Sequence, residues 1–495
     1  MIAHIQMKKI PLYCLALCLP LSAQVQGQSQ IPPSGQNPAT QTLQSTAQQA
    51  LTTHPEMLAR WHAWQAARNE REVAAGGARP RVDLTSSIGR EKLHESGQSD
   101  DFNTHTLSLT LTQLLYDGGG RKNETQRFQY VSNVRLYEFY AAGEGVALDV
   151  TRAWFDVLRY RKLLTLAEDN YVQHKAVFEQ IQSKVKAGVA RRVDLEQATG
   201  RLALSEANLV TETSNLHDVS ARFQRLTGTF PAREMESNLI MEKDLPPNIT
   251  SALRAAISRH PGLRAAIENV RAANSAAKLQ QASYAPKVDF RLRTEQAQNP
   301  DSRATGNRRD NVAEVVMSWN LYNGGSDQSR IRQYADLLGQ AADERERACI
   351  DVRQNLSVSY NEMRKLAEQL TYFDQHQLAI DKARQAYRKQ FEIGQRTLLD
   401  VLDTENELFQ ARRSHTNAEF DLQIAYARAH AGFGGLVSLL NANLKPGETL
   451  PDLSRDNLGD AVAQCGPDTP PLYNVDRAVL DQRARDLLKE GGLGK

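Results

Sequence analysis

The feature that most constrains the fold of this chain is an internal repeat with a constant offset of 206 residues. The pair His54-Pro55 recurs as His260-Pro261, and the run LYDGG at 115–119 recurs as LYNGG at 321–325. Because the copies align without a gap, the chain is a tandem duplication, and both copies should fold alike. The expected order is repeat 1 at 45–230, a linker at 231–248, repeat 2 at 249–437 and a C-terminal tail at 438–495.

Each repeat contains a long stretch without proline. None of the 18 prolines lies within 81–230 or within 301–445. Proline inside a helix costs about 3 kcal/mol, and both stretches are rich in Ala, Leu, Gln, Glu and Arg. They predict unbroken helices over about 121–187 and 327–392.

A short break after each long helix predicts a returning helix, over about 194–227 and 400–432. A short helix is also expected in the tail, at 473–488. In the second long helix the apolar residues follow the 4, 3, 4, 3 spacing of a coiled coil: Leu356, Tyr360, Met363, Ala367 and Leu370.

Ahead of each long helix the pattern changes. A first helix is expected over 41–78 and over 249–284. Apolar and polar residues then alternate on both sides of a polar loop, which predicts a β-hairpin at 80–116 and another at 286–322, with strands of about 10 residues. One face of each hairpin is apolar, and the other carries Ser, Thr, Asp and Arg.

The N-terminus carries a secretory pattern. A pair of lysines at 8–9 is followed by an apolar run at 10–21 and small residues at 22–23. This order predicts a signal peptide at 1–23, with cleavage that could extend to 27, and a flexible segment at 24–44 behind it.

Composition excludes several classes of protein. Lys and Arg number 60 against 58 Asp and Glu, a net charge of +2, whereas a nucleic-acid-binding protein needs a clear basic excess. No apolar run of about 18 residues follows the N-terminal segment, which excludes a polytopic helical membrane protein. A disulfide scaffold is excluded because Cys14 and Cys18 lie in the signal, and whether Cys349 and Cys465 pair stays open.

The two hairpins raise a problem of closure. Their length and single apolar face suit a membrane-crossing sheet whose other face lines water. Open strand edges are not tolerated in lipid, and even small barrels use about eight strands. If its four strands span a membrane, the chain must oligomerise, giving eight strands as a dimer or twelve as a trimer. The expected fold class is mainly α with a membrane β portion.

Together these features resemble the TolC family of outer-membrane export ducts. The resemblance covers about 45–437 and rests on the signal, the duplicated halves, the hairpins that open at Pro80 and Pro286, and the strand-to-helix turns. Its most specific motif is GQRTLLDVLDTEN at 394–406. The run AYARAHAG at 425–432 further resembles the branch that exports large adhesins by type I secretion.

The resemblance implies a homotrimer with a twelve-stranded barrel in the outer membrane of a Gram-negative bacterium. Its long coiled-coil helices would form an α-helical tunnel across the periplasm. The implied partners are a periplasmic adaptor, an inner-membrane ABC transporter, outer-membrane lipid and a secreted unfolded protein, with no nucleic acid. The prediction is the channel subunit of a type I secretion system, passing a large adhesin or RTX-type protein.

Two other functions stay open from the sequence. A multidrug or small-molecule efflux duct would share the fold and differ in its pump. A periplasmic coiled-coil scaffold or adaptor without a pore would explain the helices but not the alternating hairpins. An enzyme is not expected, because the sequence has no GxSxG, Walker lysine, HExxH or CxxC motif. No cofactor, metal or catalytic residue is predicted.

The resemblance assigns roles to residues at the second helical break. Asp400 and Asp403 match an acidic periplasmic constriction, where six carboxylates from three copies would repel one another, favour cations and have raised pKa values. A closed-state lock would involve Arg396, Phe391 (where the family often has Tyr) and Asp194. The ion pair between its arginine and a carboxylate would have to break before the helices could move apart and open the channel.

A structural explanation stands beside this one. Asp194 and Thr397 each begin a four-residue segment that fits a helix capping box. Asp194 and Asp400 are also repeat equivalents, so both could serve only to cap helices.

Asp403 and Arg396 lack this symmetry, because repeat 1 has Gln197 and Ala190 in their places. They are therefore the better functional candidates. Glycines are expected to form the turns, with positive φ at the helix breaks: Gly188, Gly394, Gly118, Gly119, Gly324 and Gly325.

Overall fold

The computed structural model describes residues 40–95, 97–236, 240–298, 306–447 and 474–489. These all belong to one unit, 37–495. The expected signal peptide, most of the segment at 24–44, and Cys465 lie outside the described residues. Cys349 is buried and takes part in a disulfide.

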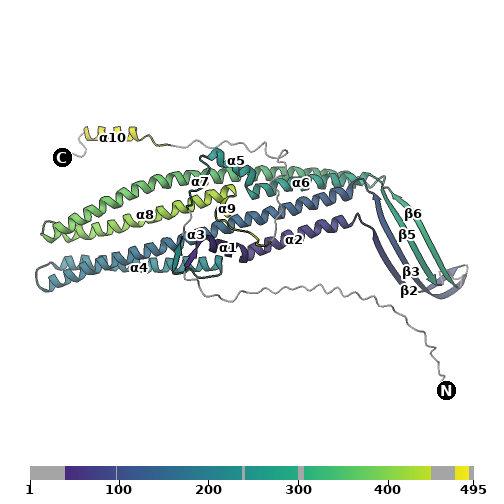
Figure 1. Ribbon diagram of the computed structural model, residues 1–495, viewed down its shortest axis with the longest axis horizontal. Coiled ribbons are helices and arrows are strands. Elements are labelled where there is room, and N and C mark those ends of the chain that lie inside the picture. Colours follow the sequence, from purple (N-terminus) through teal and green to yellow (C-terminus); the bar gives the residue numbers. More distant parts are fainter. Residues whose placement is uncertain (1–39, 96, 237–239, 299–305, 448–473, 490–495) are drawn as a thin grey trace, which may run out of the picture. The chain divides into compact units, whose positions relative to one another are not determined.

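Each repeat is a β-hairpin followed by two long antiparallel helices (Figure 1). Repeat 1 contains β2 Arg81–Glu95, β3 Gln98–Tyr116, α3 Gly120–Lys186 and α4 Arg192–Thr227. Repeat 2 contains β5 Lys287–Gln298, β6 Asn307–Ser318, α7 Ser326–Glu392 and α8 Leu398–Phe433. The sheet lies at one end of the long helices, and the α3–α4 and α7–α8 turns lie at the other. The strands, of 12 to 19 residues, exceed the expected length of about 10.

The first helix of each repeat is broken, contrary to expectation. Repeat 1 has α1 Leu43–Thr53 and α2 Pro55–Gly76, and repeat 2 has α5 Ile249–Arg259 and α6 Pro261–Gln281, followed by the 3-10 turn η1 Ala282–Tyr284. Proline has no N–H and disfavours helical backbone at the residue before it, so the breaks fall at His54 and His260. Each histidine caps the next helix: Nδ1 of His54 accepts from Glu56 N–H at 3.3 Å, and Nδ1 of His260 accepts from Leu263 N–H at 3.2 Å.

Two segments expected to be irregular contain short strands. β1 Thr40–Thr42, at the end of the segment predicted to be flexible, pairs in parallel with β4 Glu234–Glu236 of the predicted linker. The buried Gln41 side chain accepts a hydrogen bond from Ala232 N–H at 2.9 Å. This pairing orders the chain from Thr40 onward and connects the two ends of repeat 1.

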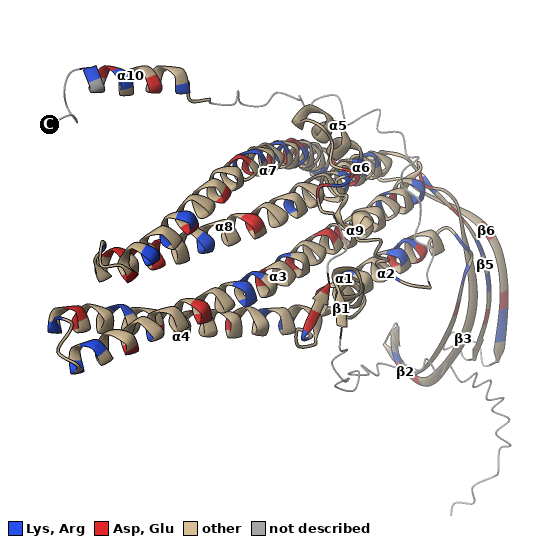
Figure 2. Cartoon of the chain, turned by 60° about the vertical axis from the view of Figure 1, so that its left-hand side comes forward, with Lys and Arg blue, Asp and Glu red and all other residues tan. Residues whose placement is uncertain are grey.

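Among the described residues, α8 is followed by two further helices. α9 Leu436–Leu439 packs against α3, and α10 Arg477–Lys489 lies close to the helix predicted at 473–488. α10 runs toward the same end of the structure as the α7–α8 turn (Figures 1 and 2).

The four long strands form one antiparallel sheet in the order β2-β3-β5-β6, which leaves β2 and β6 as its edges. Directly paired residues share a face. One row on the apolar face reads Val82, Leu111, Leu292 and Ala313, and the next row, on the polar face, reads Arg81, Thr112, Arg291 and Glu314. The apolar face is open in the single chain, with Leu84 and Ile88 70% and 80% exposed.

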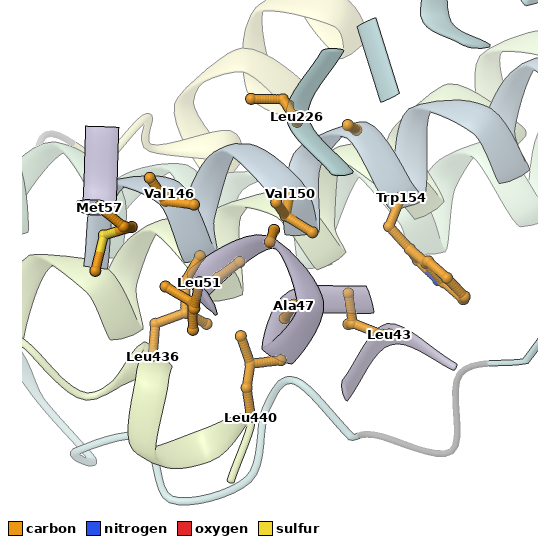
Figure 3. Close-up of a cluster of buried hydrophobic side chains, with 14 of the residues drawn as sticks. Leu43, Ala47, Leu51, Met57, Val146, Val150, Trp154, Leu226, Leu436 and Leu440 are labelled. Atoms are coloured by element: carbon orange, nitrogen blue, oxygen red, sulfur yellow. The ribbon is translucent and has the colours of Figure 1, made fainter. Parts of the chain in front are cut away.

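The main hydrophobic core forms where α1 and α9 pack against α3. Figure 3 shows Leu51 of α1 and Leu436 of α9 beside Val146 and Val150 of α3. Trp154 of α3 is fully buried, so it is a packing residue, as its place in the apolar pattern predicts.

Glycines form the turns that the sequence predicts. Gly188 and Gly394 have φ of 74° and 80° at the two helix breaks, a left-handed conformation that strains other residues. Gly118 has φ of 66°, and a Cβ there would lie 2.3 Å from Cβ of Ala285, so only glycine fits. Positive φ recurs in the other turn glycines, Gly119, Gly324 and Gly325.

Candidate functional site

The turn between α7 and α8 carries most of the predicted site. Thr397 is the N-cap of α8, and its hydroxyl accepts from Asp400 N–H at 3.3 Å and donates to Asp400 Oδ2 at 2.8 Å. The same carboxylate oxygen accepts from Thr397 N–H at 3.1 Å, which completes a capping box. These bonds, with the hydroxyl first, lower the pKa of Asp400. In the single chain the pKa of Asp400 is therefore lowered, whereas a raised pKa is expected where three copies bring six carboxylates together.

Asp403, the second carboxylate of the predicted constriction, has a partner that the sequence did not suggest. It forms an ion pair with Arg201 of α4, so it connects the second helical hairpin to the first. Arg201 also faces His174 of α3, which is buried. Burial, followed by the charge of Arg201, lowers the pKa of His174 below its usual range.

The predicted lock residues do not meet within one chain. The Arg396 guanidinium lies 4.3 Å from the ring centroid of Tyr387, and its Nε donates to Gln390 Oε1 at 3.1 Å. Its nearest carboxylate oxygen is Oδ2 of Asp400, 4.0 Å from Nη1. A tie from Arg396 to Asp194 or Phe391 therefore stays a prediction about an assembly of several copies.

Asp194 is not the cap of α4. The N-cap is Arg191, which makes no side-chain capping bond, and Asp194 lies in the first turn of the helix. The Arg191 guanidinium pairs with the Asp194 carboxylate at 3.2 Å. The capping explanation is thus confirmed for Thr397 and Asp400 and wrong for Asp194.

Phe391 packs in a small apolar cluster that joins the two hairpin tips. Ile181 of α3 and Leu398 and Leu402 of α8 form its buried centre, and Phe391 packs against them. The ammonium of Lys184 lies 5.4 Å from the Phe391 ring centroid. Phe391 contributes apolar contact and a cation–π face here, where a tyrosine would add a hydroxyl.

A buried carboxylate just behind the tip was not predicted. Glu405 of α8 is 5% exposed, and its Oε1 lies 2.8 Å from Nε of Arg388 and 3.5 Å from Nη1 of Arg384. Arg388 also donates to Gln173 of α3. Repeat asymmetry was the available signal, because Thr199 and Gln182 occupy the places of Glu405 and Arg388 in repeat 1.

Further from the tip, α3 of repeat 1 also packs against α8 of repeat 2, and ion pairs cross this contact. Nη2 of Arg159 lies 2.6 Å from Asp421 Oδ1, and Nζ of Lys162 lies 2.7 Å from Glu419 Oε2. Figure 2 shows charged residues of both signs along these helices and at both tips.

No helix in the part of the chain that the structure describes is long and apolar enough to cross a membrane. Within the same part, no group of three His, Cys, Asp or Glu side chains is placed to hold a metal ion.

The fold defines a class: a protein with a four-stranded antiparallel sheet, open on its apolar face, at one end of long helical hairpins whose turns carry charged residues. Both repeats, at residues 46–229 and 252–434, match the family described as outer membrane efflux protein. The chain belongs to this TolC-like family and is an outer-membrane channel of a Gram-negative bacterium with a large periplasmic helical portion.

Individual proteins agree with this assignment. Outer membrane efflux protein BepC of Brucella suis biovar 1 (strain 1330) is 26% identical over 404 residues, covering 80% of this chain and 82% of BepC. Alkaline protease secretion protein AprF of Pseudomonas aeruginosa is 24% identical over 431 residues, covering 81% and 86%. The solved structure of CusC has a TM-score of 0.72 at 16% identity, over 79% of this chain and 92% of CusC.

Proposed function

We propose that this protein is the outer-membrane channel of a type I secretion system and that three copies close one twelve-stranded barrel. The observation that carries the proposal is the sheet. Its apolar face is exposed in the single chain, with Val315 and Met317 63% and 64% exposed, and among the described residues the edge strands β2 and β6 each pair with a strand on one side only. Lipid would cover the face, and pairing of β6 with β2 of the next copy would close the edges.

The polar face of the sheet supports a polypeptide as cargo. Its charges are paired with opposite charges on the same face: Arg81 with Asp83 at 2.8 Å, Arg291 with Glu314 at 3.5 Å, Arg293 with Glu295 at 3.5 Å and Arg308 with Asp310 at 2.7 Å. A wall with paired charges attracts neither sign strongly. Such a wall suits an unfolded chain that carries both signs.

The similarity to AprF, a protein named for protease secretion, supports the same conclusion. The run AYARAHAG does not add to it. Ala427 and Ala429 are fully buried, and Nε2 of His430 lies 3.0 Å from Met241 O, so the run serves packing. The similarity to BepC, which is named for efflux, makes drug efflux the second candidate.

In the proposed trimer the α3–α4 and α7–α8 turns converge on the periplasmic entrance. Asp400 and Asp403 would line the constriction there, and Arg396, Phe391 and Asp194 would meet across copies as the lock. A periplasmic adaptor and an inner-membrane ABC transporter would dock at this end, and the transporter would supply the energy.

The test is deletion of the gene, followed by complementation, with two readouts. For type I secretion we expect loss of a large surface or secreted protein, with drug susceptibility changed less than twofold. The opposite result, unchanged secretion and a severalfold rise in susceptibility, would establish efflux instead. Purified protein should be trimeric in detergent and conduct ions in planar bilayers, and a monomer without conductance would contradict the channel.

A further inference from the structure

The α3–α8 contact between the two repeats joins opposite charges and aromatic rings. Besides Arg159–Asp421 and Lys162–Glu419, the rings of Phe155 and Phe420 lie 6.4 Å apart across α3 and α8. These pairs hold the two helical hairpins of one chain side by side.

The duplication shows what the contact between copies would contain. In the proposed trimer, on which this inference rests, α7 takes the place of α3, and α4 of the next copy takes the place of α8. The residues of α7 lie 206 positions after those of α3, and the residues of α4 lie 206 positions before those of α8. The corresponding pairs between copies are therefore Asn361 with Ser214, Lys365 with Asn215 and Glu368 with Thr213. None of these joins opposite charges or two apolar groups. At these positions the contact between copies therefore lacks the ion pairs and the aromatic contact found within a chain.

The tail supplies a cation at this place. Arg477, at the start of α10, forms an ion pair with Glu368 and a hydrogen bond with the hydroxyl of Tyr372. Its guanidinium lies 5.1 Å from the Tyr372 ring centroid. Just before α10, Asn474 Oδ1 accepts from Arg364 Nη1 at 3.3 Å. Glu368 is the repeat equivalent of Lys162, so it lies on the side of α7 that would face the next copy.

From this anchor α10 carries an apolar face with no cover in the single chain. Val479, Leu480 and Leu487 are 46–60% exposed and fall within about 100° of one another around the helix. At 1.5 Å per residue, this apolar face extends to about 15 Å beyond Arg477, the distance to Leu487.

An apolar position on α4 matches this face. Val210 is 70% exposed, whereas its repeat equivalent, Thr416 of α8, is 2% exposed. Val210 lies one turn beyond Thr213, in the direction in which α10 runs. Leu204, 44% exposed, lies six residues further but about 120° away around α4, so it belongs to another side of the helix. Val210 lies three residues from Thr213 and Leu480 three residues from Arg477, so these two apolar side chains lie at the same level.

We propose that α10 is a latch between copies: it is anchored by Arg477 on α7 of its own chain, and it packs the apolar face around Leu480 on Val210 of the neighbouring α4. Repeat 1 has no counterpart of this latch, because ion pairs and an aromatic contact already stabilise the α3–α8 contact within a chain.

Disulfide cross-linking tests the placement. Leu480→Cys combined with Val210→Cys, oxidised with copper phenanthroline in the full-length protein, should give chains covalently linked to one another. The control combines Leu480→Cys with Val189→Cys, an equally exposed valine at the α3–α4 turn, and should give no such product. Trimers without cross-links, or with equal yields from both pairs, overturn the latch. A monomeric protein overturns the trimer of the proposed function itself.

A charge exchange tests the anchor. Arg477→Glu should raise the rate of trimer dissociation by up to about fivefold for each contact between copies, the range for an exposed ion pair. Adding Glu368→Arg should restore the rate, and Arg485→Glu, on the same helix, should leave it unchanged. An equal effect of Arg477→Glu and Arg485→Glu, or no rescue, contradicts an anchor at Glu368.

Discussion

α4 and α8 descend from one duplicated helix, yet their first turns differ. α8 begins with a complete capping box, whereas α4 begins at Arg191 without a side-chain cap. The glycine before each helix has positive φ in both copies. Asp403 and Glu405, which repeat 1 replaces by Gln197 and Thr199, contact α4 and α7 instead of their own turn. Residues that the two repeats share thus form the turn, whereas residues that differ between the repeats form ion pairs with neighbouring helices.

The largest expected effect comes from removing the buried asymmetric charge. Glu405→Thr gives α8 the residue that α4 has at this position. Arg388 and Arg384 would lose their buried partner, and breaking such a pair typically costs 3–5 kcal/mol. We expect about 3 kcal/mol, because water reaches Arg388, whose side chain is 36% exposed. Denaturant unfolding of the purified protein measures the loss.

The matched control is Thr199→Ser in α4, at an exposed position that should change the unfolding free energy by about 0.5 kcal/mol or less. A loss for Glu405→Thr no larger than this control would mean that Glu405 does not tie the hairpins.

The second prediction concerns two titratable groups away from the tip, Glu144 and His260, whose pKa values are shifted by burial. Only Glu144 breaks the symmetry of the repeats, since His260 repeats His54. Burial raises the pKa of Glu144 to about 7, from an ordinary value of 4.5. Glu144 is more readily protonated in the folded protein, so its contribution to stability is full below pH 4.5 and is lost as the pH rises through 7. Its counterpart in repeat 2 is Ile350, half exposed.

Burial also lowers the pKa of His260 to about 4, from 6.5. Its contribution to stability is full above pH 6.5 and is lost as the pH falls through 4. Each group changes the unfolding free energy by on the order of 3 kcal/mol, and in opposite directions, so the two largely offset each other between pH 4.5 and 6.5.

Single substitutions should separate the two effects. Glu144→Gln keeps an acceptor for Leu436 N–H, 3.0 Å from Oε2 of Glu144, and should make the protein lose stability on acidification from pH 6.5 to 4. His260→Asn keeps a good cap and should make it lose stability from pH 5 to 8. Unfolding at these pH values checks the signs, and parallel pH curves for both variants and the native protein would refute the assignment.

A smaller effect is expected at the α8 cap itself. Thr397→Ala removes the hydroxyl that binds Asp400 and should cost about 1 kcal/mol. Thr199→Val, another hydroxyl loss in the equivalent hairpin, is the control, because the Thr199 hydroxyl bonds only Leu195 O in its own helix. Equal losses from both would show that the capping box adds nothing beyond an ordinary hydroxyl.

The sequence predicted most of the long elements because their signals repeat. Missing prolines and the 206-residue offset placed α3 and α7 to within about a residue at each end. The repeated His-Pro pairs indicate helix starts, and α2 and α6 do begin at Pro55 and Pro261. No break was placed inside the helices expected over 41–78 and 249–284, although the restriction before proline acts locally. β1 and β4 were missed because three-residue strands leave no periodic pattern.

The site was less predictable, because its partners lie far apart in the chain. The capping box at Thr397 is local and was predicted. Arg201 and Asp403 are separated by 202 residues, and only the packing of α4 near α8 brings them together. Comparing the repeats position by position would have singled out Glu405 and Arg388 as well.

The smallest expected change in stability belongs to Arg396 of the proposed closed-state lock and Asp403 of the proposed constriction. Arg396→Ala and Asp403→Gln give repeat 2 the residues of repeat 1. Both side chains are exposed, so each change should cost no more than about 1 kcal/mol. If these residues hold the entrance closed, single-channel conductance should nevertheless rise and cells should become more sensitive to large antibiotics. The effect on leakage would then far exceed the effect on folding, which a structural cap such as Thr397 would not produce. Unchanged conductance and unchanged sensitivity in both variants would place the gate elsewhere, with the buried Glu405–Arg388 pair as the next position to test.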